Sequence, residues 1–130
     1  MMSIIEVYGG MLLRALGQTL LLTLLSLLFA MIIGMIFGLM NVGHNRVLNL
    51  LGTIYVDAVR GVPLIVLAYF IYFGVPAGMQ GLGFSSFRLN ALQAGTAALS
   101  MNCGAYMAEI IRAGIESVDR GQMEASRSLG

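Results

Sequence analysis

The sequence predicts an all-α integral membrane protein, a helical bundle of three transmembrane helices followed by a short cytoplasmic helix. Hydrophobic residues make up 58% of the 130 residues and charged residues only 10%. Ordinary soluble domains carry about 25% charged residues, which keep their surface dissolved. The mean hydropathy is +0.89, and long stretches contain no charged side chain. The chain therefore lacks the surface of a soluble protein.

The composition also argues against several functions. The net charge is +1, with seven arginines and no lysine, whereas nucleic-acid binding needs clustered basic residues. One cysteine, Cys103, and one histidine, His44, are too few for an internal disulfide or a Cys/His metal site. An intramembrane serine enzyme needs a base on a helix that faces its nucleophile, and His44 lies in a predicted loop. We predict no catalytic residue, no metal, no cofactor and no nucleic-acid partner.

The first span is predicted at about residues 17–40. No charged residue occurs from Ala15 to Gly43, and a helix needs about 20 apolar residues to cross the bilayer core. A cleaved signal peptide would have an apolar core of only about 7–15 residues behind a basic N-terminus. Here the apolar run is longer and Glu6 precedes it, which favours a membrane span.

Small residues recur every fourth position along this span. Side chains at this spacing share one helix face, and the pattern lets two helices approach closely in lipid. We predict helix packing through these residues, within one subunit or, as the less favoured alternative, between subunits. They are Ser26, Ala30, Gly34 and Gly38.

The second span is predicted at about residues 61–78. Pro63 lies at its start, where a missing backbone N–H costs little. Aromatic residues gather toward its far end, as they do at the headgroup level. The segment 75–87 contains Pro76 and several glycines, so it is interpreted as a loop. The aromatic residues are Tyr69, Phe70, Tyr72 and Phe73.

The third span is predicted at about residues 90–112 and is the least apolar. Steps of three and four place small and polar residues on one face, and Asn102 lies roughly midway along the helix. An amide at that depth must be hydrogen-bonded or hydrated. It either joins two helices or lies on a substrate path. Cys103 is interpreted as a small packing residue. The face contains Ala91, Gly95, Ala98, Asn102, Ala105, Glu109 and Arg112.

The arginines predict the orientation of these spans. Cytoplasmic loops carry an excess of basic residues. An N-terminus outside the cell leaves two arginines, Arg14 and Arg88, outside and places five in the cytoplasm. The five are Arg46, Arg60, Arg112, Arg120 and Arg127.

Two segments resemble a known family. One is residues 55–66, with the element Arg60-Gly61-x-Pro63, and the other is residues 99–130. The chain's ending resembles the E-A-A-x-x-x-G signature of ABC importer permeases: Glu124, Ala125 and Gly130 match it, and Ser126 replaces the second alanine. Together the segments resemble the membrane subunit of polar amino-acid ABC importers, the group that handles histidine, glutamine, glutamate and arginine. The similarity covers about residues 18–130.

The resemblance implies a multi-pass permease component of an ATP-driven amino-acid importer in the bacterial inner membrane. ATP hydrolysis would take place on a separate subunit, so the chain itself would not be an enzyme. The implied partners are an ATP-binding subunit, a second permease subunit (identical or homologous), an extracytoplasmic amino-acid-binding protein and membrane lipid. The residues expected on the substrate path are Asn102, Gly104, Tyr106 and Glu109.

The resemblance also implies that residues 119–130 form a coupling helix seated in a groove of the ATPase subunit. The sequence supports a helix here, because Asp119 and Gln122 match a capping box. Glu124 is expected in the first turn, where a negative charge suits the helix dipole, and Gly130 suits a C-terminal stop. The residues expected to couple to the ATPase are Asp119, Gly121, Glu124, Ala125 and Gly130.

The chain departs from the family at its end. In the family the signature lies mid-chain and further membrane helices follow, whereas this sequence stops at Gly130. We therefore expect residues 1–130 to be the N-terminal part of the transmembrane domain, as a fragment or the product of a broken gene. The alternatives are a non-functional permease remnant, a small structural membrane protein, or a fragment of a secondary transporter or channel. A secondary transporter or channel gives no reason for the signature.

Overall fold

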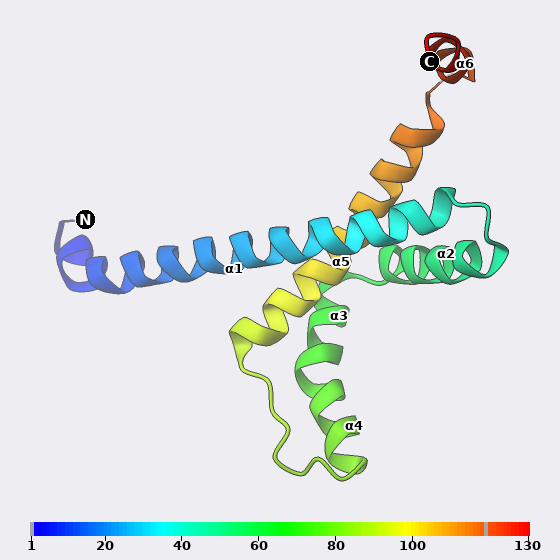
Figure 1. The fold of residues 1–130 in the computed structure, drawn as a ribbon. Helices are drawn as coiled ribbons and strands as arrows, with labels where there is room; N and C mark the ends of the chain where they lie inside the picture. Colours follow the sequence, from blue (N-terminus) through cyan, green and yellow to red (C-terminus); the bar gives the residue numbers. More distant parts are fainter. Residues whose placement is uncertain (1, 119) are drawn as a thin grey trace.

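The structure is a computed structural model that describes residues 2–118 and 120–130. Helices joined by short connections make up this part of the chain, which contains no strand (Figure 1). The predicted all-α fold is therefore confirmed. In chain order the elements are α1 (Met2–Val42), α2 (Arg46–Gly61), α3 (Leu64–Tyr69), the π-helical turn η1 (Phe70–Gly74), α4 (Val75–Gly81), α5 (Ala91–Glu116) and α6 (Arg120–Ser128).

Two helical stretches are long and apolar enough to cross a membrane. They are Ser3–Val42, which contains the first predicted span, and Leu64–Gly81, which overlaps the second. The 26 residues of α5 reach about 39 Å at 1.5 Å per residue. Helix α5 is less apolar than the other two stretches because of its Asn, Gln, Glu and Arg side chains, so its role as the third span stays a prediction.

The crossing of α1 and α5 organises the molecule (Figure 1). Helix α5 passes across the second half of α1 and also contacts α2 and α3. The first third of α1 extends beyond this bundle, and its side chains from Ser3 onward are exposed. Helix α6 lies past the far end of α5.

Helix α2 corrects the sequence interpretation, which placed only a loop between the first two spans. The Asn45 side chain caps it by accepting hydrogen bonds from the backbone N–H groups of Val47 and Leu48, at 2.9 and 3.3 Å. A Cβ at Gly52 would collide with the Asn41 side chain, so the glycine lets α2 lie close to the end of α1. Helix α2 was missed because at 16 residues it is too short for a span.

The loop predicted at residues 75–87 is wrong over its first half, because Val75–Gly81 is helical. Pro76 lacks a backbone N–H, but it stands at the start of α4, directly after the π-helical turn, where that donor is not required. The helical stretch thus continues to Gly81, so the aromatic residues 69–73 lie near its middle. Their place at the headgroup level stays a prediction.

Two polar side chains that were predicted inside the third span form a cap at the start of α5. Asn90 accepts a hydrogen bond from the Gln93 backbone N–H at 2.7 Å, and Gln93 accepts one from the Asn90 backbone N–H at 3.1 Å. This capping box stands at the helix N-terminus, before the apolar part. The helix then runs to Glu116 rather than to residue 112.

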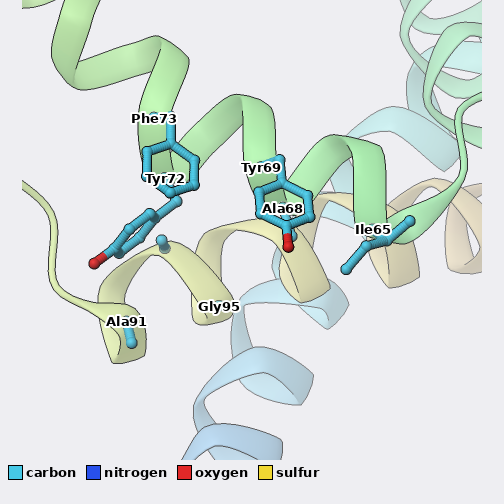
Figure 2. A pocket seen from close by; sticks show the side chains of 8 residues that line it. Ile65, Ala68, Tyr69, Tyr72, Phe73, Ala91 and Gly95 are labelled. Carbon is cyan, nitrogen blue, oxygen red and sulfur yellow. The ribbon is translucent and has the colours of Figure 1, made fainter.

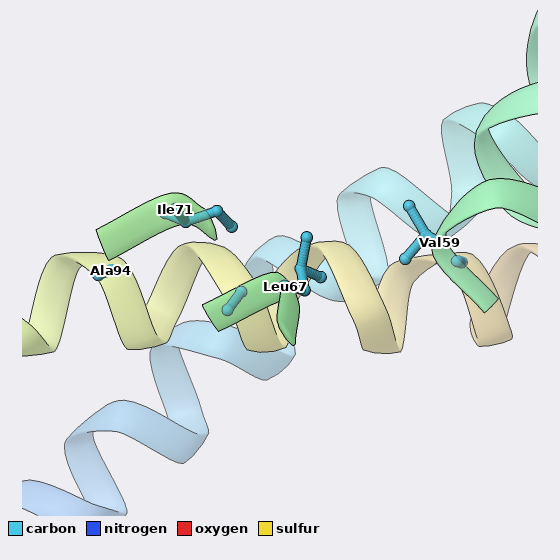
Figure 3. Close-up of a cluster of buried hydrophobic side chains, with 6 residues drawn as sticks. Val59, Leu67, Ile71 and Ala94 are labelled. Atoms are coloured by element: carbon cyan, nitrogen blue, oxygen red, sulfur yellow. The ribbon is translucent and has the colours of Figure 1, made fainter. Parts of the chain in front are cut away.

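The core lies where α2, α3 and η1 meet α5. Val59, Leu67 and Ile71 are buried against small side chains of α5, and Figure 3 shows these larger side chains beside the α5 ribbon. Small residues allow helices to pack closely where lipid supplies no hydrophobic drive between them. The buried α5 residues of this cluster are Ala94, Ala98 and Ala105.

Candidate functional site

The predicted packing residues of α1 lie against α5. All four are buried, and the backbones come unusually close. A Cβ on Gly34 would stand 2.6 Å from the Met107 Cβ, and a Cβ on Gly104 would stand 2.7 Å from the Ile33 Cγ2. The Ser100 hydroxyl also donates a hydrogen bond to the Ser26 carbonyl at 3.4 Å. The structure therefore places these residues in a contact within one chain.

A groove runs between α3–η1 and α5. Its first part is a cavity of about 320 Å³, where Tyr69 and Tyr72 form an aromatic side and the first turns of α5 form a small-residue side (Figure 2). A second cavity of about 360 Å³ shares three lining residues with the first and continues past Leu64 and Leu99. We call the two together the α3–α5 groove. The shared residues are Ile65, Ala68 and Gly95.

Polar residues of α5 continue along the side that lines the groove. Asn102 follows Gly95 and Ala98 at helical spacing, and it is partly buried. Its side-chain amide makes no hydrogen bond within the described part of the chain. Tyr106 and Glu109 come next along this side. Gly104 does not belong to this group, because it is buried against Ile33 of α1.

A charged cluster joins the end of α2 to α5. The Arg60 guanidinium lies 4.0 Å from the Glu109 carboxylate and 5.4 Å from the centre of the Tyr106 ring. Arg112 donates from Nε to the same carboxylate at 3.0 Å and also pairs with Glu116. Arg60 was predicted in a motif and on the cytoplasmic side, but this contact between helices was not predicted. The sequence feature that could have pointed to this contact was the position of Arg60 next to Gly61 and Pro63.

Helix α2 is also anchored to the middle of α5. The Tyr55 hydroxyl donates a hydrogen bond to the Met101 carbonyl at 2.7 Å. Its ring stacks on Phe37 of α1, with ring centres 4.2 Å apart. Burial raises the pKa of the Tyr55 phenol to about 12, so the hydroxyl keeps its proton at neutral pH and remains a donor. Tyr55 therefore ties three helices together.

The coupling segment forms α6, which is exposed along its described side chains. Asp119, the predicted cap, lies outside the described residues. The prediction that Glu124 lies in the first turn is wrong, because the helix begins at Arg120 and Glu124 therefore falls in the second turn. Gly130 has a φ of +109°, a conformation that favours glycine. Gly121 and Ala125 lie in α6 itself.

Apolar side chains on and next to α6 are not buried by other described residues. Met123 is 55% exposed and Leu129, just past the helix end, is 90% exposed. Large exposed apolar side chains of this kind often mark a contact surface. No group of three or more His, Cys, Asp and Glu side chains that could hold a metal ion occurs within residues 2–118 and 120–130.

The fold has stretches that are long and apolar enough to cross a membrane, packed through small residues. Such a fold is typical of a helical membrane protein. Residues 26–130 match the family described as "Binding-protein-dependent transport system inner membrane component", and the chain belongs to this family. The resemblance to ABC importer permeases is thereby confirmed.

Named relatives agree with this family. The chain is 49% identical over 84 residues to the "Probable glutamine ABC transporter permease protein GlnM" of Bacillus subtilis, a match that covers 64% of this chain and 35% of GlnM. It is 45% identical over 76 residues to the arginine transport system permease protein ArtQ of the same organism, which covers 58% of this chain and 32% of ArtQ. The chain thus spans about a third of these curated relatives.

A solved structure supports the fold. It is described as "Crystal structure of an amino acid ABC transporter with histidines", and it matches with a TM-score of 0.84 at 38% identity. The match covers 99% of this chain and 56% of the solved chain. The curated relatives carry permease names, and the solved chain comes from an amino acid ABC transporter.

Proposed function

We propose that this chain is the N-terminal part of the permease subunit of an ATP-driven importer of polar amino acids. The observation that carries the proposal is the α3–α5 groove, which is lined along α5 as far as Ala98 and Leu99. Beyond the groove, Asn102, Tyr106 and Glu109 follow on the same side of α5 at helical spacing. The names of the relatives, for glutamine and arginine transport, support the substrate class. The chain's own substrate within this class is the part of the proposal that uptake assays decide.

The unpaired amide of Asn102 supports a translocation path on this side of α5. A polar group at the depth of a bilayer needs a hydrogen-bonding partner or water. The described residues supply no partner for the Asn102 side chain. An aqueous path, or a polar substrate in it, would provide one.

The proposed assembly contains an ATP-binding subunit on α6, a second permease subunit, and an extracytoplasmic amino-acid-binding protein on the opposite side of the inner membrane. The exposed surface of α6 supports the first contact. Extensive apolar surface on α1 supports contact with lipid and with the second permease subunit.

Asn102→Leu tests the proposed path, in the full-length transporter. We expect normal amounts of the permease in the membrane but about tenfold lower uptake of radiolabelled amino acid, or an altered order of preference, because the amide is lost at mid-depth. Asn102→Gln keeps an amide and should retain most of the uptake. Cys103→Leu adds a leucine at the neighbouring exposed position and is the matched control. Uptake by Asn102→Leu equal to wild type would make Asn102 a packing residue.

The proposed orientation has the N-terminus outside and α6 in the cytoplasm. A reporter enzyme that is active only in the cytoplasm should work when fused after Gly130 and fail when fused near Gly81. The physical reason is the excess of arginine on the proposed cytoplasmic side. Activity of the Gly81 fusion together with a silent Gly130 fusion would reverse the topology.

A further inference from the structure

We infer that the contact of Arg60 with Glu109 and Tyr106 transmits movement from the C-terminal end of α5, next to α6, to the residues that line the α3–α5 groove. We call this contact the tie. Arg60 would then be a positioning residue of the transport cycle. The inference rests on the proposed function, in which α6 receives the movement of the ATPase. It adds a route from that helix to the groove.

One end of the tie lies directly beside the groove. Arg60 is in the last turn of α2, and only residues 61–63 separate α2 from α3. The connection is short and hydrogen-bonded: the Val62 N–H donates to the Val59 carbonyl at 3.2 Å, and the Leu67 N–H donates to the Pro63 carbonyl at 3.1 Å. A shift of the backbone at the end of α2 would therefore move the start of α3. The first residues of α3, Leu64 and Ile65, line the groove.

The other end of the tie lies on the helix that leads to α6. Glu109 is held by Arg112, which pairs in turn with Glu116 at the end of α5. These pairs at i, i+3 and i, i+4 lie along one helix face. They make Glu109 part of the last two turns of α5, so the carboxylate follows any movement of that end.

Arg60 is the member of the cluster that crosses between helices, and it is loosely held. Its 4.0 Å separation from Glu109 is longer than a hydrogen bond, and its side chain remains 39% exposed. The Tyr106 ring offers the same cation a second contact. Meanwhile Tyr55 and Met101 hold α2 to α5 further up the helix. The contact at Arg60 can therefore shorten or open while α2 stays attached.

The test varies Arg60 and leaves Glu109 intact, because Glu109 also pairs with Arg112. The variants are Arg60→Glu, Arg60→Ala and Arg60→Lys, with Arg46→Glu at the other end of α2 as the matched control. The complete transporter is reconstituted in lipid, and amino-acid uptake per ATP hydrolysed is measured. We expect this ratio to fall about tenfold in Arg60→Glu, less in Arg60→Ala and little in Arg60→Lys. Arg46→Glu should behave as wild type.

A second readout follows the groove itself. In a Cys103→Ser background, Ala68→Cys places a new thiol in the groove. Its labelling by a maleimide, above that of the Cys103→Ser variant without the new thiol, is timed with and without ATP and vanadate. We expect ATP to change the labelling rate in the parent and in Arg60→Lys but not in Arg60→Glu. An ATP response that persists in Arg60→Glu, or that is missing from the parent, would overturn the tie. If the wild type shows the labelling response but takes up no amino acid, only the proposed substrate is refuted.

Discussion

Gly34→Leu is expected to abolish the close contact of α1 and α5 and with it the stable permease. A Cβ alone at this position would meet the Met107 Cβ at 2.6 Å and the Ala108 backbone nitrogen at 3.3 Å, and backbone cannot move aside as a side-chain end can. Overpacking of this kind lowers the free energy of unfolding by about 3 kcal/mol. In lipid no hydrophobic driving force brings separated helices back together. The measurement is the amount of folded permease in the membrane and its thermal unfolding in detergent.

The same helix provides a matched control for Gly34→Leu. A Cβ at Gly17 would stand in open space, so Gly17→Leu makes the same change in side chain and helix propensity without the collision. Gly114→Leu serves likewise on α5, where the surroundings are also open. If Gly34→Leu were as abundant and as stable as Gly17→Leu, the α1–α5 contact would not determine the stability of the subunit.

Glu124→Lys and Gly130→Asp are expected to uncouple ATP hydrolysis from transport or to release the ATPase from the membrane, in the full-length transporter. Glu124→Lys reverses a charge on the exposed surface of α6. Gly130→Asp adds a charge where φ is +109°, a conformation that costs a residue with a Cβ about 1–2 kcal/mol. We expect uptake to fall at least about tenfold, the effect of losing about 1.4 kcal/mol of coupling.

Co-purification of the ATPase with the permease, alongside uptake, measures this effect. Glu6→Lys and Gly10→Asp make the same exchanges near the start of α1, where Gly10 is open, and should leave the ATPase bound. Capture of substrate by the external binding protein should be unchanged in both α6 variants, because that step takes place on the other face of the membrane. Normal ATPase retention and normal uptake in both α6 variants would refute the coupling role.

The predicted elements that depend on local composition agree best with the structure. The predicted span at residues 17–40 lies within α1, and the recurrence of small residues at every fourth position identified the small face that α1 buries. Helix α2 escaped prediction because its 16 residues are too few for a membrane span. The error at residues 75–87 came from Pro76 and nearby glycines, which usually interrupt a helix but here follow a π-helical turn.

The candidate site was less accessible to prediction. Asn102 and Glu109 were found from their spacing on α5, but Gly104 was grouped with them although its neighbours lie in α1. The contact of Arg60 with Glu109 joins residues far apart in the chain. No periodicity within one helix shows which face of another helix it will meet.

The sequence by itself therefore determined the all-helical membrane class, the two apolar stretches, the small face of α1 and the family motifs. Each of these depends on properties of neighbouring residues: hydropathy, side-chain size and the helical repeat. The tertiary structure decided that this small face meets α5, that α2 ties Tyr55 and Arg60 to α5, and that a groove opens beside α3. These features depend on how the surfaces of two helices fit together. The residue pattern within one helix does not show which surface of another helix it will contact.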